Sequence, residues 1–350
     1  MRATGGGLYA RPPPPSACGY PRPVRIRLRR ALAATALLLA GCGGGAPAAA
    51  PVQDHVHSAV GGHAAGEILL GTHYGLRIST DGGRTWPSAG DLGRTQIRLL
   101  VAARDGYVAV TGAEDGSSAT MISADGRHWS GVAGMPAGRP VSALVAGATP
   151  GSVWAEVTDV GILGSDDGGH TWHAVDPTPL TINDIAPGVD GPNLLAYASS
   201  AGVFLALGPQ LSPLGDAPWL EGDAQTVHRW SACPRCLVAT LSGAVATSAD
   251  GGRHWATHAT RLPFTDVLSW GGGGGALLGV APSPASPDHG LYLSTDGAAT
   301  WTRVIDAPLV DHLLLPDATG APLLAFRWGI SVYRSVDAGR TWTAEGPLRG

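Results

Sequence analysis

Polar and ionisable side chains stand near the start of seven short segments that are otherwise apolar. The segments read DHVHSAV, TQIRLLV, RPVSALV, LTINDIA, AQTVHRW, PFTDVLS and PLVDHLL. When they are aligned, one column contains His57, Arg98, Ser142, Asn183, Val227, Asp266 and Asp311, and its neighbour adds Asp184, His228 and His312. Buried polar groups need partners, so we expect these side chains to line a solvated opening.

The residue types in these columns suit an anionic or sugar-like ligand. Arginine binds carboxylates, aromatic rings cover a ring face, and carboxylates bind hydroxyl groups or act as acids. The predicted ligand-binding residues are His57, His73, Tyr74, Arg98, Asn183, His312, Arg327 and Trp328. The catalytic candidates are Asp184, Asp266 and Asp311. The alternative is that these groups only satisfy one another around a water-filled hole.

A recurring string indicates the elements that position these residues. Its copies are STDGGRTW (79–86), SADGRHW (123–129), SDDGGHTW (165–172), SADGGRHW (248–255), STDGAATW (294–301) and SVDAGRTW (335–342). Successive tryptophans are 43, 43, 83, 46 and 41 residues apart. The interval of 83 equals two periods, and PLGDAPW (213–219) is our candidate for a degenerate copy within it. The sequence therefore predicts seven units of about 42 residues.

Each unit contains short apolar or alternating runs, and no long segment with helical periodicity follows residue 53. This pattern predicts an all-β fold, a seven-bladed β-propeller of four-stranded blades over residues 54–350. In such a fold the innermost strands begin at one face of a central channel. We call that end of the ring the channel mouth. Loops between second and third strands open on the same face.

The recurring string is expected to form the hairpin between the third and fourth strands of a blade. Its aspartate can accept backbone N–H groups, its glycines reach positive φ, and its tryptophan packs across the turn. We therefore assign structural roles to Asp81, Trp86, Asp125, Trp129, Asp167, Trp172, Asp250, Trp255, Asp296, Trp301, Asp337 and Trp342.

These strings resemble the Asp-box, or BNR, repeat of sialidases, sortilin-type receptors, reelin and propeller-type photosystem assembly factors. The resemblance implies a propeller fold, but the repeat occurs in enzymes and in binding proteins. Sialidases also carry an FRIP-like string before the first box, whereas this chain has HYGLRI there and only FRWG (326–329) elsewhere. The sialidase catalytic residues therefore cannot be placed on this sequence.

The first 53 residues resemble a lipoprotein leader. A basic stretch, VRIRLRR, precedes the apolar run ALAATALLLA, which is too short to span a bilayer, and LAGC follows. The likeness to a bacterial lipobox implies cleavage before Cys42 and lipidation of its thiol; the alternative is an ordinary secretory signal. We expect a signal peptide over residues 1–41, with a true start near Val24, and a flexible tether over residues 42–53. The mature chain would lie on the extracytoplasmic face of the membrane.

Net charge, cysteine positions and histidine positions limit the ligands and partners that the sequence predicts. Removing residues 1–41 leaves 16 basic and 27 acidic residues, a net charge of −11, which disfavours nucleic acid as a partner. Cys233 and Cys236 (CPRC) precede a β run, so we expect a local disulfide rather than a redox centre. The string HVH, with His63 and His73, raises the question of a metal site. His55 and His57 would share a strand face and could chelate, but no acid or cysteine stands at ligand spacing nearby. We predict no metal, no cofactor and a monomer.

Two functions from different classes follow. The first is a membrane-anchored propeller that binds a glycan, peptide or protein partner at the channel mouth. The second is a glycoside hydrolase that uses two of the acids Asp184, Asp266 and Asp311. The sequence favours the first, because no complete catalytic set can be assembled.

Overall fold

The computed structural model describes residues 54–112, 117–136, 138–147, 149–176, 184–187, 194–198, 202–207, 210–213, 224–315, 322–328 and 331–348. All of them belong to one compact unit, residues 51–350. The predicted leader with Cys42, the predicted ligand residue Asn183 and residues 214–219 of the degenerate copy lie outside the described residues. In the described part of the chain, no helix is long and apolar enough to cross a membrane.

Seven antiparallel sheets make up this unit, each from consecutive strands. The first sheet has β1 (Val56–Gly61), β2 (Ile68–Thr72) and β3 (Gly75–Ser79). The second has β4 (Ile97–Ala103), β5 (Gly106–Gly112), β6 (Ser118–Ser123) and β7 (Ser130–Gly131). The third has β8 (Val141–Ala146), β9 (Val153–Val157), β10 (Gly161–Ser165) and β11 (His173–Asp176). The fourth has β12 (Asp184–Pro187), β13 (Leu194–Ala198), β14 (Gly202–Leu207) and β15 (Gln210–Pro213).

The remaining three sheets repeat the same plan. The fifth has β16 (Ala224–Arg229), β17 (Leu237–Leu241), β18 (Ala244–Ser248) and β19 (Ala256–Ala259). The sixth has β20 (Asp266–Leu268), β21 (Leu277–Ala281), β22 (Gly290–Ser294) and β23 (Thr302–Ile305). The seventh has β24 (Val310–Leu314), β25 (Leu323–Arg327), β26 (Ser331–Ser335) and β27 (Thr343–Pro347). Cys233 and Cys236 form a disulfide between β16 and β17.

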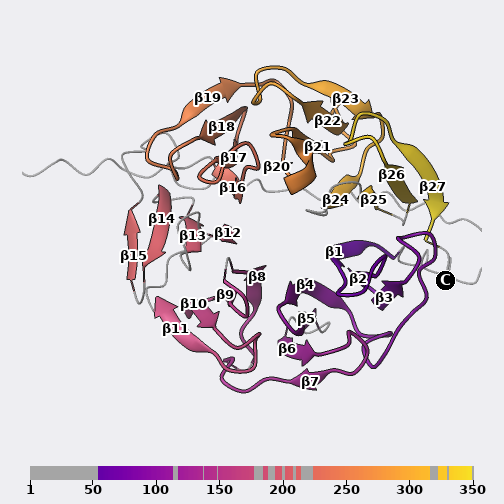
Figure 1. The fold of residues 1–350 in the computed structure, drawn as a ribbon, viewed down its shortest axis with the longest axis vertical. Coiled ribbons are helices and arrows are strands. Elements are labelled where there is room, and N and C mark those ends of the chain that lie inside the picture. Colours follow the sequence, from indigo (N-terminus) through magenta and orange to yellow (C-terminus); the bar gives the residue numbers. More distant parts are fainter. Residues whose placement is uncertain are drawn as a thin grey trace, which may run out of the picture. The chain divides into compact units, whose positions relative to one another are not determined.

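The sheets stand in a ring with their first strands innermost (Figure 1). The first strands contact one another in the order β1, β4, β8, β12, β16 and β20, and β21 contacts β24. The ring is closed by direct contact between β24 and β1. Strands such as β2 and β10 are buried along their whole length, because neighbouring sheets cover both of their faces. The all-β propeller fold is therefore as predicted.

The prediction of seven four-stranded blades is wrong. Six sheets have four strands, but the first has three. After Trp86 comes Pro87, which has no backbone N–H to donate to a ladder. The segment that follows joins β3 only through a single bridge, Arg77 to Ser88, and irregular hydrogen bonds such as Ile78 N–H to the Pro87 carbonyl (3.1 Å).

Five of the six recurring strings lie between the third and fourth strands of a sheet, and the contacts of residues 165–172 are representative. The buried Ser165 hydroxyl donates to Asp167 Oδ1 (2.8 Å) and accepts the Gly169 N–H (2.8 Å). The Asp167 carboxylate also accepts the backbone N–H (2.9 Å) and hydroxyl (2.6 Å) of Thr171. Trp172 closes the turn by donating Nε1–H to the Gly169 carbonyl (2.9 Å). Slight burial would raise the pKa of Asp167, but the Thr171 and Ser165 hydrogen bonds outweigh it and lower the pKa to about 2.

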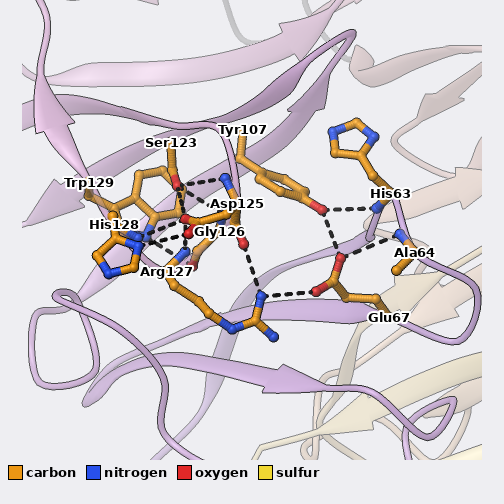
Figure 2. A network of polar contacts seen from close by, with 10 residues as sticks. All are labelled: His63, Ala64, Glu67, Tyr107, Ser123, Asp125, Gly126, Arg127, His128 and Trp129. Carbon is orange, nitrogen blue, oxygen red and sulfur yellow. Dashed lines mark hydrogen bonds and ion pairs between the residues drawn. The ribbon is translucent and has the colours of Figure 1, made fainter.

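A polar network joins the first and second sheets at the face where these turns lie (Figure 2). The Tyr107 hydroxyl donates to Glu67 Oε2 (3.1 Å) and accepts the His63 backbone N–H (2.9 Å), while Arg127 Nη1 lies 3.4 Å from Glu67 Oε1. Burial raises the pKa of Tyr107 to about 12, aided by the negative charge of Glu67. The network therefore links the three-stranded sheet to its neighbour.

We expect Ser165→Ala to lower the free energy of unfolding by about 1–3 kcal/mol, because it leaves the buried Gly169 N–H without a partner. Urea denaturation followed by tryptophan fluorescence measures the change. Ser130→Ala, at an exposed position of β7, is the matched control and should shift stability by about 0.5 kcal/mol at most. Equal effects of the two substitutions would show that the serine hydroxyl does not stabilise the turn.

Candidate functional site

The register of the first strands places extra residues at the channel mouth. In β1, Val56 pairs with Thr72 and Ser58 pairs with Gly71, so His57 is left over as a β-bulge. The same shift occurs in β4, β8, β16 and β24. The residues added by these bulges are His57, Arg98, Ser142, Gln225 and Asp311. Bulges change where a side chain points, and here they recur at one end of the ring.

This register corrects the alignment made from sequence. The fifth sheet contributes Gln225, not Val227, to the column of His57. Asp266 pairs with Val280, one residue before the end of β21, so it corresponds to Ser58 rather than to His57. By the same criterion Asp184, Thr226 and Asp266 share one layer. The bulge adds a residue without changing the apolar pattern, so alternation alone could not reveal the shift.

Three histidines converge at the mouth of the first sheet, and we call them the imidazole group: His55, His57 and His73. One ring nitrogen of each lies within 4.8 Å of those of the other two. His55 precedes β1 and His73 follows β2, and the His73 N–H donates to the His55 carbonyl (3.0 Å), which ties the two segments together. The Gln96 amide, just before β4, donates to His57 Nε2 (3.3 Å) and His73 Nδ1 (3.1 Å).

Burial keeps the imidazole of His57 neutral. It is the largest cause that lowers the pKa of His57 to about 4, and the charges of His55, His312, His73 and Arg98 add to it. The charge effects also show that the seventh and second sheets bring His312 and Arg98 close to this group. At neutral pH His57 therefore offers a lone pair, which it directs at the Gln96 amide.

Aromatic and polar neighbours hold the imidazole group in place. The Trp328 ring, which follows β25, stacks on His55 with ring centres 3.8 Å apart and an angle of 12° between planes. Tyr74 stands edge-on to His73 at 5.0 Å. Tyr74 and Trp328 remain 47% and 44% exposed, so they form the rim of the mouth. Buried Asp54 accepts the Tyr74 N–H (3.3 Å) and pairs with Arg77 (3.0 Å), which fixes the β2–β3 turn.

The remaining predicted residues of this side differ in how far they are engaged. Arg98 makes no ion pair among the described residues. Arg327 donates Nε–H to the Pro308 carbonyl (3.0 Å). Asp311 Oδ1 lies 3.1 Å from Nδ1 of its neighbour His312. Two arginines and six rings, counting the imidazoles, Tyr74 and Trp328, therefore gather around the first, second and seventh sheets.

A second cluster, which we call the acid–histidine group, contains Asp184, His228 and Asp266. It spans the fourth, fifth and sixth sheets. His228 Nε2 lies 2.8 Å from Asp266 Oδ1, and Thr226 donates its hydroxyl to the same oxygen (2.8 Å). Asp184 accepts the backbone N–H of Val227 (3.1 Å) on Oδ2 and that of Ile185 (2.9 Å) on Oδ1. Each carboxylate is thus engaged by the neighbouring sheet.

The pKa values of this group are shifted apart. Burial opposes charge on His228, but the Asp266 carboxylate and its hydrogen bond outweigh it and raise the pKa of His228 to about 9. Burial also acts to raise the pKa of Asp266, yet the His228 charge lowers it overall. For Asp184 burial prevails over the His228 charge and raises the pKa to about 6. The three groups thus carry about one positive and one to two negative charges at neutral pH.

A hollow of about 390 Å³ adjoins this group. Its lining comes from β4, β8, β12 and β16, and includes Leu99, Ser142, Leu144, Asp184, Ile185 and His228. Two larger hollows, of about 550 and 600 Å³, lie at the opposite face, one beside the recurring turns of the second and third sheets and one beside the disulfide. Of these three hollows, only the one beside the acid–histidine group contacts a predicted catalytic residue, Asp184.

Sequence reasoning missed two residues of the site. Gln96 links two histidines, and Thr226 holds Asp266. Both stand within the quoted segments TQIRLLV and AQTVHRW: Gln96 is two residues before the bulge residue of its strand, and Thr226 is one residue after that of its own. Their polar side chains beside apolar runs were the available signal.

No protein-family model matches the sequence, and no curated protein matches it. Among solved structures, the chain is similar to YCF48 bound to D1 peptide, with a TM-score of 0.59 and 15% identity over 80% of this chain and 91% of that one. An ancestral GH74 enzyme gives a TM-score of 0.62 and 12% identity over 85% of this chain and 48% of the enzyme. PorZ, a surface component of the type-IX secretion system of Porphyromonas gingivalis, gives 0.59 and 11% over 84% and 38%. At these identities the similarity concerns the fold.

The His228–Asp266 contact predicts a pH dependence. Because the pKa of His228 is above the ordinary value of 6.5 in the folded chain, its contribution to stability is full below pH 6.5 and is lost as the pH rises toward 9. We expect NMR titration to show His228 still protonated at pH 8, and Asp266→Asn to lower its pKa by at least about one unit. Asp306→Asn, at an exposed carboxylate, is the control. An unchanged His228 titration in Asp266→Asn would contradict the assignment.

Proposed function

We propose that this protein is a non-catalytic, membrane-anchored propeller that binds a carboxylate-bearing peptide or protein segment at its channel mouth. The observation that carries the proposal is that the candidate acids are already engaged. Asp266 contacts His228 and Thr226, and Asp184 holds two backbone N–H groups. A glycosidase needs two carboxyl groups free to face the scissile bond.

The other side of the mouth offers the complementary chemistry. Arg98 has a guanidinium that no carboxylate of the described residues neutralises, and Arg327 stands on the same side. The exposed rings of Tyr74 and Trp328 provide apolar surface next to these cations. Guanidinium groups bind carboxylates in a fixed geometry, and exposed aromatic residues dominate protein–protein contacts. A glycan with a carboxylate group would meet the same chemistry.

The solved structures support this proposal through the share of each protein that the chain covers. The chain covers nearly all of a propeller that was solved with a peptide, but only about half of the GH74 enzyme. We also assign the recurring turns to the Asp-box class, on the contacts of their serine, aspartate and tryptophan residues. Because that class includes enzymes and binding proteins, it supports the fold rather than the choice between functions.

The second candidate function is glycoside hydrolysis by Asp184 and Asp266. The observation that favours it is the separation of their pKa values, with that of Asp184 raised to about 6 and that of Asp266 lowered. Such a difference is the pattern of an acid and its partner base. Buried Glu156 also has its pKa raised to about 7 by burial and by Asp159. We rank this function second because the Asp266 carboxylate is neutralised by His228.

Binding can be tested with three fluorescein-labelled octapeptides rich in Glu, Gln or Lys. We expect the full chain to prefer the Glu-rich peptide, with an affinity that falls as salt is added. Arg98→Ala should weaken this binding about tenfold or more, because a charge-assisted contact is lost. Arg253→Ala, at the opposite face, is the matched control. Fluorescence anisotropy gives the affinities.

Two results would contradict this function. One is equal binding of the three peptides, or binding that Arg98→Ala leaves unchanged. The other is turnover of fluorogenic glycosides, including a sialoside, that is lost in Asp266→Asn, in Asp184→Asn or in Asp311→Asn. That second result would establish the hydrolase instead.

The membrane anchor rests on the string LAGC and is tested separately. We expect the chain made in a bacterial host to enter the detergent phase in Triton X-114 partition, because acyl chains on Cys42 add apolar surface. Cys42→Ser should move it to the aqueous phase, whereas Cys18→Ser should not. Detergent-phase partition of Cys42→Ser would show that no lipid is attached at this cysteine.

A further inference from the structure

The imidazole group has the composition of a transition-metal site. His55, His57 and His73 each turn one ring nitrogen toward the others, within 4.8 Å. Three imidazoles are the ligand set of many zinc sites, which keep a fourth position open. The sequence predicted no metal because no acid or cysteine stands at ligand spacing near His55 and His57. The β2–β3 turn supplies the third histidine.

The surroundings of the group show how its rings are held. Trp328 stacks on His55, and the backbone bond from His73 to His55 joins the two histidine-bearing segments. Asp54 fixes the turn that carries His73 through the Tyr74 N–H and Arg77. Such outer contacts orient metal-ligating histidines and limit the rearrangement needed on binding. Ring nitrogens in a tetrahedral site lie about 3.4 Å apart, so the rings need to close in by roughly 1 Å.

The Gln96 amide lies against two of the three histidines of the imidazole group. Its N–H groups reach His57 Nε2 and His73 Nδ1, two ring nitrogens that are able to ligate a metal. A metal ion replaces these donors, and rotation of the amide brings its oxygen to the same point. The Gln96 amide therefore lies between His57 and His73, on the side of the group where the ion would bind.

The charge of the site selects the class of ion. No carboxylate belongs to the ligand set, and Arg98 lies near enough to affect His57. Hard cations such as Ca²⁺ and Mg²⁺ require several oxygen ligands and negative charge. Imidazole ligands favour Zn²⁺, Cu²⁺ and Ni²⁺. We infer that His55, His57 and His73 form a site for a divalent transition-metal ion of the zinc–copper class, independent of the peptide ligand proposed above.

Isothermal titration of the full chain, prepared without a histidine tag, tests the site with the metals alone. We expect one Zn²⁺ or Cu²⁺ to bind per chain and no binding of Ca²⁺ or Mg²⁺. His57→Ala and His73→Ala should each weaken binding by at least about 10- to 100-fold, the loss seen when weaker, outer-shell partners are removed. His170→Ala, at an exposed position of a recurring turn, is the matched control. Nitrogen hyperfine structure in the Cu²⁺ EPR spectrum should diminish in the two mouth variants only.

A second variant keeps the test informative if a histidine substitution impairs folding. Gln96→Glu has nearly the same shape but replaces the amide donors with a carboxylate that can ligate. It should tighten Zn²⁺ binding by about tenfold, since it adds negative charge and a fourth ligand. Absence of Zn²⁺ and Cu²⁺ binding, binding that the mouth histidine variants leave unchanged, or binding that Gln96→Glu does not tighten would each overturn the inference.

Discussion

The site depends on one constraint, the recurring bulge at the start of the first strands. A closed ring requires that every first strand begin at the same face, and the direct contact of β24 with β1 enforces this condition around the unit. A bulge adds one residue where the strand enters the sheet, without moving the apolar residues that follow. His57, Arg98 and Asp311 can therefore be polar while Val56, Ile97 and Val310 stay fully buried beside them.

The same geometry explains why Asp184 and Asp266 have a structural role: they link neighbouring sheets at the channel mouth. The inner strands of neighbouring sheets share few backbone hydrogen bonds, since each sheet pairs only with itself. Asp184 supplies one link by accepting the Val227 N–H of the next sheet, and Asp266 supplies another through His228 and Thr226. Half-buried carboxylates of this kind cost free energy unless they are paired, and these pairs fix the spacing of three sheets. A catalytic role would require Asp184 and Asp266 to give up these contacts with the neighbouring sheet.

The sequence could predict the repeated sheets, but it could not predict which residues of different sheets and turns lie close together. The tryptophan spacing indicated the propeller. Pro87 follows the first recurring string and lacks a backbone N–H, so it is the residue that indicates that the first sheet has no regular fourth strand. The pair His55 and His57 followed from strand alternation. The approach of His73 and Gln96 depends on how a turn and a neighbouring sheet fold over that pair. The register of Asp266 was missed because β20 pairs with β21 without the bulge found in five other first strands, so a single alignment does not hold for all of them.

The mouth consequently has two unlike halves. The fourth to sixth sheets carry the acid–histidine group, in which the charge of His228 is paired with that of Asp266. The first, second and seventh sheets carry the imidazole group, exposed rings and an arginine that no described carboxylate neutralises. Since the mature chain would carry a net charge of −11, the field of the whole molecule would not favour the approach of an anion. Recognition has to come from short-range contacts, which favours a ligand held by direct arginine and ring contacts over one gathered by the field of the whole molecule.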